Sequence, residues 1–70
     1  MHKSIFRVTL IWSDESNSWY TESDDIPGLV LGADTFDELV ARVNEAAPEL
    51  LELNLGYKGA AEFHFAATSI

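Results

Sequence analysis

The fold is decided by the stretch Glu22-Ser23-Asp24-Asp25-Ile26-Pro27-Gly28-Leu29-Val30-Leu31-Gly32-Ala33-Asp34-Thr35, which holds a strand end, a tight turn, a further strand and a helix cap in direct succession. Proline fixes the backbone angle required at the first corner of a β-turn, and glycine supplies the positive angle required at the second corner. We therefore predict a type II turn over Ile26–Leu29. No residue of this stretch belongs to a motif that would cleave, transfer or oxidise a substrate.

Two strands are predicted before this turn and one after it. Apolar residues alternate from Ile5 to Trp12, which is typical of a strand with one buried face. A polar loop over 13–18, stabilised by Asp14 or Asn17, leads to a second strand that begins at Trp19. Alternation resumes after the turn, from Leu29 to Ala33. Because the links are short, the three strands are expected to form an antiparallel meander.

The period changes to that of a helix at Thr35. Thr35 can cap the first turn while Glu38 reaches back to it, the reciprocal arrangement called a capping box. Pro48 lacks an amide hydrogen, so we expect a kink, or a break and a restart, at that position. The apolar residues that follow Thr35 at helical spacing form one stripe that can lie on the sheet: Phe36, Leu39, Val40, Val43, Ala47, Leu50 and Leu51.

A fourth strand is predicted over Ala60–Ala67, returning to the sheet beneath the helix. The helix gives a connection long enough for this strand to lie parallel beside the first. The expected fold is α+β, in the order β-β-β-α-β, with a single domain over residues 1–70. A domain of this size without cysteine has a thin margin of stability, so oligomerisation is expected to support it.

The chain carries 12 Asp and Glu against 4 Lys and Arg, a formal net charge of -8. Its basic residues, Lys3, Arg7, Arg42 and Lys58, are scattered along the sequence, so direct binding to nucleic acid is disfavoured and a basic protein partner is favoured. No apolar stretch is long enough for a signal-peptide core or a membrane span. The absence of cysteine fits a reducing cytoplasm.

Candidates for chemistry are few. Asp24, Asp25 and Asp34 lie at predicted strand ends, where aspartates are more often turn formers and caps than metal ligands. His2 and His64 are far apart in sequence and have no cysteine or paired histidine beside them, which makes a zinc site improbable. Aromatic side chains without accompanying positive charge are interpreted as core and dimer-interface residues rather than as a platform for stacking bases: Trp12, Trp19, Tyr20, Phe63 and Phe65.

The layout over Ile5–Asn54 resembles the HicB-like antitoxin superfamily. The resemblance rests on a second strand that begins with Trp19, on Asp-Ile-Pro-Gly-Leu at 25–29, on Ala-Asp-Thr at 33–35, and on Pro-Glu-Leu-Leu-Glu-Leu-Asn at 48–54. The last motif is more typical of a short, uncharacterised bacterial branch. The resemblance implies a partial ribonuclease H-like fold without catalytic carboxylates, and a partner such as HicA, a small basic toxin that cuts messenger RNA. Full HicB proteins usually add a C-terminal DNA-binding module, which these 70 residues do not contain.

We therefore expect a non-enzymatic, cytoplasmic interaction domain that needs no cofactor or metal, forms a homodimer or tetramer, and masks a small basic toxin. Two alternatives remain open: an oligomeric structural or regulatory module with no toxin partner, and, with less support, a metal-dependent nuclease. The residues expected to contact a partner are exposed acids and one histidine: Glu22, Asp24, Asp25, Glu62 and His64.

Overall fold

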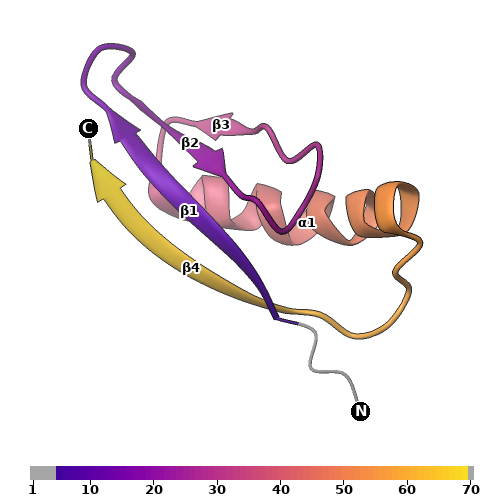
Figure 1. The fold of residues 1–70 in the computed structure, drawn as a ribbon. Helices are drawn as coiled ribbons and strands as arrows, with labels where there is room; N and C mark the ends of the chain where they lie inside the picture. The colour runs from indigo at the N-terminus through magenta and orange to yellow at the C-terminus, as the bar shows by residue number, and fades with distance from the viewer. Residues whose placement is uncertain (1–4, 70) are drawn as a thin grey trace.

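A computed structural model describes residues 5–69 and contains one four-stranded sheet and one helix (Figure 1). The strands lie in the order β3-β2-β1-β4. β1 pairs antiparallel with β2, β2 pairs antiparallel with β3, and β1 pairs parallel with β4. The predicted α+β order is confirmed, with these bounds: β1 Ile5–Ser13, β2 Ser18–Glu22, β3 Gly32–Ala33, α1 Phe36–Leu55 and β4 Glu62–Ser69.

The core lies between one face of the sheet and α1. Val8 and Leu10 of β1 point to this side, as the alternation predicts, and both are buried. The predicted helical stripe supplies the opposing residues, of which Leu39 and Val43 are fully buried. Ile26 and Leu29, which flank the turn, also belong to this core. The buried residues of this core cluster are Val8, Leu10, Ile26, Leu29, Leu39, Val43, Ala47 and Leu51. Ile11 of β1 is also buried, outside this cluster.

The predicted turn is present. Leu29 N–H donates to the carbonyl oxygen of Ile26 at 3.3 Å, and Gly28 has a φ of 85°. The turn also touches the far end of the helix, because Asn54 Nδ2 donates to the carbonyl oxygen of Pro27 at 2.9 Å. The turn is therefore held to α1 as well as to the sheet.

The third strand is shorter than predicted, since β3 contains only Gly32–Ala33. Thr21 explains the difference. Its buried hydroxyl accepts from the Leu31 N–H at 3.0 Å and donates to the Leu29 carbonyl oxygen at 3.3 Å. A side chain therefore makes contacts that a regular strand ladder would make with backbone groups, and the segment 29–31 follows β2 without becoming a strand.

The helix begins and ends with caps that the sequence indicates. Thr35 Oγ1 accepts from the Glu38 N–H at 3.1 Å, which confirms the predicted N-cap. The Glu38 carboxylate, however, accepts from Arg42 at 3.0 Å instead of reaching back to Thr35. At the other end Gly56 has a φ of 67°, and its N–H donates to the carbonyl oxygen of Glu52 at 3.0 Å.

The predicted break at Pro48 is wrong, because α1 is one continuous helix through this residue. Proline removes the hydrogen bond to the carbonyl oxygen four residues earlier, which belongs to Asn44. Both Pro48 and Asn44 are exposed. Water can therefore bind the carbonyl oxygen that the proline leaves without a donor, and the helix continues.

The fourth strand lies two residues later than predicted and is only partly covered by the helix. α1 packs against β2 and β3, and Figure 1 shows β4 at the outer edge of the sheet. Phe63 and Phe65 reach the core from the first half of the strand and are half-buried. Residues 66–69 are exposed. The expectation that this strand lies beneath the helix is therefore met only at its start.

Candidate functional site

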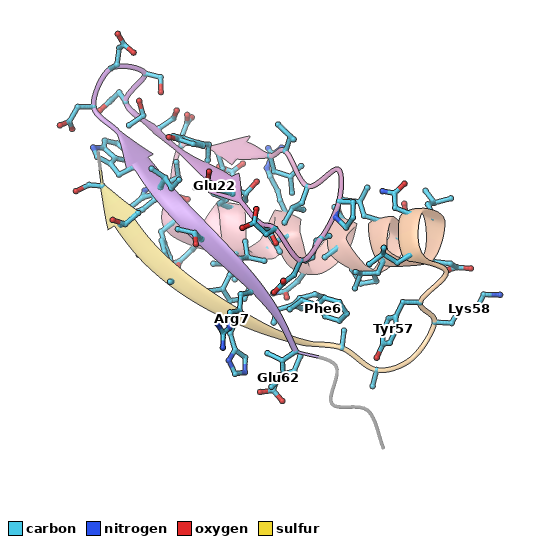
Figure 2. All side chains as sticks on the ribbon, in the orientation of Figure 1. Phe6, Arg7, Glu22, Tyr57, Lys58 and Glu62 are labelled. Carbon is cyan, nitrogen blue, oxygen red and sulfur yellow. The ribbon has the colours of Figure 1, made fainter. Side chains whose placement is uncertain are left out.

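The face of the sheet opposite α1, called here the open face, carries most of the residues predicted to contact a partner. The strand register places Thr9 of β1 beside Glu22 of β2. It also places Arg7 beside His64 and Ile5 beside Glu62, both on β4. Because paired residues point to the same side of a sheet, these side chains share one surface. Figure 2 labels Arg7 on β1 and Glu62 on the adjacent β4.

The Ser23-Asp24-Asp25 run continues the contact between β2 and β1 beyond the end of β2. Asp25 Oδ2 accepts from the Arg7 N–H at 2.8 Å, and Ser23 Oγ donates to the Arg7 carbonyl oxygen at 2.7 Å. Ser23 Oγ also accepts from the N–H groups of Asp25 and Ile26, each at 3.2 Å. Two side chains thus satisfy the backbone of Arg7 where the regular ladder has stopped.

This arrangement leaves a hollow of about 410 Å³ at the edge of the open face. Three carboxylates and one guanidinium contribute to its wall, so its lining is predominantly acidic. The lining residues are Arg7, Thr9, Glu22, Ser23, Asp24 and Asp25. The predicted contact residues Glu22, Asp24 and Asp25 are therefore brought together in one place.

The two remaining predicted contact residues form a separate pair. Glu62 Oε2 lies in hydrogen-bonding contact with His64 Nε2 on β4, and both side chains are exposed. Arg7 lies between this pair and the acidic hollow, since it is beside His64 in the register and also lines the hollow. Sequence reasoning treated Arg7 only as one of several scattered bases. Its alternation with Val8 places it on the open face, but its neighbours depend on pairing between distant segments.

The hollow does not gather ligands in a metal-binding arrangement. Within residues 5–69, no three His, Cys, Asp or Glu side chains lie together in a group that could hold a metal ion. Asp34, the third strand-end aspartate, lines a different hollow beside Glu38 and Arg42. His2 and Lys3 lie outside the described residues.

The aromatic residues gather mainly on the helix side. Trp19 contacts both Trp12 and Phe36 edge to face, with ring centroids 5.4 and 5.2 Å apart. Trp12 Nε1 donates to Asp14 Oδ1 at 2.6 Å, which ties the hairpin loop to β1. Near the other end, Phe6 contacts Tyr57 with centroids 5.4 Å apart, and Figure 2 shows these two rings together. These contacts place Phe6, Trp19, Phe36 and Tyr57 in the packing between sheet and helix.

A second hollow, of about 280 Å³, lies between the end of α1 and the start of β4. Its wall is more apolar than that of the acidic hollow and includes Pro48, Tyr57 and Phe63. Among the described residues, α1 is too polar to be a candidate for crossing a membrane.

Comparison with known proteins finds a solved structure with a closely similar fold, and the matches do not carry an assigned activity. The chain is similar to a hypothetical protein, TTHA1013, from the extremely thermophilic bacterium Thermus thermophilus, whose crystal structure aligns with a TM-score of 0.83 at 38% sequence identity. The alignment covers 91% of this chain and 92% of that chain. No curated protein matches the chain. The family model described as a domain of unknown function (DUF1902) matches residues 5–70, and the chain therefore belongs to this family.

Proposed function

We propose that this protein is a non-enzymatic, cytoplasmic interaction domain of the HicB-like type, which binds a small basic protein through the acidic hollow on its open face. The observation that carries the proposal is the convergence of Glu22, Asp24 and Asp25 around one hollow. A formal net charge of -8 adds long-range attraction for a basic partner. The resemblance to HicB-like antitoxins suggests that this partner is a toxin that cuts messenger RNA.

The Ser23 hydroxyl in the hollow is engaged by the backbone and is not arranged as a nucleophile. Ser23 Oγ donates to one backbone carbonyl oxygen and accepts from two backbone N–H groups, so it has a structural role. A nucleophilic serine needs a neighbouring base that takes its proton. The proton of Ser23 is instead directed to the Arg7 carbonyl oxygen, which is not a base.

Glu22 and Asp24 are the residues to change in a test of this proposal. Asp25 accepts a backbone hydrogen bond that supports the fold. Its substitution would therefore change both the affinity for a partner and the stability of the domain, and the two effects could not be separated. Glu22 and Asp24 are both exposed and line the hollow. Replacing both with neutral amides removes two charges and keeps the side-chain volumes.

The test uses the product of a short basic reading frame next to the gene for this chain. The two proteins are co-expressed, and complex formation is measured by size-exclusion chromatography at low and high salt. We expect a complex that weakens as salt rises and that the double variant Glu22→Gln, Asp24→Asn weakens by at least about tenfold. The control is Glu45→Gln, Glu49→Gln, which removes the same charge from exposed positions on α1.

Three results would overturn the proposal. These are the absence of such a reading frame, the absence of a complex even at low salt, and an equal loss of binding in the control. The first result would favour the alternative of an oligomeric structural or regulatory module, which the uncovered outer part of β4 supports. Both candidate functions, the toxin-binding domain and the oligomeric module, include self-association of the chain. Cleavage of RNA that depends on magnesium or manganese, and is lost in Asp24→Asn, would instead favour a nuclease.

A further inference from the structure

The outer edge of β4 is a long strand edge with little protection. Its eight residues lie at the end of the sheet, and within residues 5–69 no strand pairs with its outer side. Such edges are usually protected by charged residues, proline, bulges or a covering helix. The segment Phe63–Ser69 contains no proline and no acidic or lysine residue. α1 packs mainly against β2 and β3, and only the first half of β4 reaches the core.

The distribution of charge allows this edge, unlike the other surfaces, to pair with a second copy of the chain. Two copies of a chain with a net charge of -8 repel each other wherever their acidic surfaces meet. The open face presents Glu22 and Asp24, and the outer side of α1 presents Glu45 and Glu49. The segment Phe63–Ser69 is free of carboxylates. Two copies can therefore meet along β4 without bringing acidic side chains together.

Symmetry then determines how the two strands lie. A dimer with a two-fold axis uses the same surface on both copies. For two edge strands in one continuous sheet, an axis perpendicular to the sheet makes the strands antiparallel and keeps each face on its own side. The α1 helices of both copies then lie on the same side of the joined sheet. In this arrangement one residue of β4 must lie opposite its own counterpart.

We propose that β4 pairs antiparallel with β4 of a second copy, with Ala66 opposite Ala66 of that copy, to form one sheet from both subunits. This inference rests on the self-association that forms part of the proposed function. Ala66 is the middle residue of the acid-free segment 63–69, so this register overlaps the whole segment with itself.

The side chains fit this register. On the helix side, the large ring of Phe65 faces the small side chain of Ala67 from the second copy, and Phe63 faces Ser69. The half-buried rings of Phe63 and Phe65 thereby become more deeply buried. On the open face, His64 faces Thr68. The two Glu62 carboxylates lie at opposite ends of the paired strands, where they do not repel each other.

The test places a charge on the two-fold axis. Ala66→Lys and Ala66→Glu each bring two like charges into direct opposition, with Cβ atoms about 5 Å apart. We expect sedimentation velocity to show a wild-type dimer, and to show that either variant alone associates at least about tenfold more weakly. An equimolar mixture of the two variants should recover the dimer, because the lysine then faces a glutamate. The matched control is Ala41→Lys, at an exposed alanine on α1, which should leave the dimer unchanged.

The outcomes separate this interface from the wider proposal. A wild-type chain that is monomeric at every concentration overturns self-association and the β4 interface together. A wild-type dimer that persists in both Ala66 variants overturns the β4 interface alone. Recovery in the mixture shows that each variant is folded, since an unfolded chain would not pair. Weakening in each variant without recovery in the mixture counts against Ala66 lying opposite its counterpart.

Discussion

The Asp25 carboxylate accepts a hydrogen bond from the backbone N–H of Arg7 at 2.8 Å, across 18 residues of sequence. This bond links the loop after β2 to β1 and shapes the wall of the acidic hollow. Asp24, its neighbour, lines the same hollow, and its side chain is exposed. The two aspartates therefore have different roles although they are adjacent and chemically identical.

Asp25→Ala is expected to lower the free energy of unfolding by about 1 to 2 kcal/mol, because it removes a charged acceptor from a backbone donor. Asp24→Ala serves as the matched control and should change it by less than about 0.5 kcal/mol, as is usual for exposed positions without such contacts. Urea unfolding followed by circular dichroism measures both values. Equal effects of the two substitutions would contradict the structural role of Asp25.

Thr21→Val is expected to destabilise the protein by about 1 to 3 kcal/mol, although the two side chains have nearly the same shape. The substitution removes the hydroxyl that bonds to the Leu29 carbonyl oxygen and the Leu31 N–H, so a buried and a half-buried backbone group lose this partner. Thr21→Ser keeps the hydroxyl and should retain the two hydrogen bonds. Hydrogen exchange at the Leu31 amide reports the local effect, and unchanged protection in the valine variant would show that this bond does not hold the segment.

Gly28→Ala is expected to destabilise the protein more than Gly56→Ala does. Both glycines have positive φ values, of 85° and 67°, so both substitutions strain the backbone by about 1 to 2 kcal/mol. A Cβ atom at Gly28 would also lie 3.2 Å from Asn54 Nδ2, whereas one at Gly56 would meet nothing within 4 Å. The difference between the two variants in urea unfolding therefore measures the packing of the turn against α1. A larger effect at Gly56 would contradict that packing.

The features that sequence alone predicts correctly are those determined by neighbouring residues. The turn depends on Pro27 and Gly28, which lie side by side, and the helix cap depends on Thr35 and the amide three residues later. The length of β3 is different in kind. It depends on the hydroxyl of Thr21, which lies ten residues before Leu31, and no local sequence pattern predicts that contact.

The candidate site shows the same division. Exposed acids can be identified from composition and turn signals, and Glu22, Asp24 and Asp25 do line one hollow. Arg7 was missed because its place depends on two long-range relationships. One is the parallel register that sets it beside His64, and the other is the backbone contact with Asp25. Alternation gives the face of a residue, whereas strand pairing gives its neighbours.

Pro48→Ala is expected to raise the free energy of unfolding by about 1 to 3 kcal/mol, because alanine supplies the N–H that proline lacks within a helix. The new donor would bond to the carbonyl oxygen of Asn44, which the continuous helix leaves in a position to accept it. Glu49→Ala, at the next exposed position of α1, is the control and should change stability by less than about 0.5 kcal/mol. Thermal and urea unfolding at one fixed protein concentration measure both, since self-association would otherwise shift the midpoints. A loss of stability in Pro48→Ala would mean that the contact of the proline ring with the apolar hollow near Tyr57 outweighs the helix hydrogen bond.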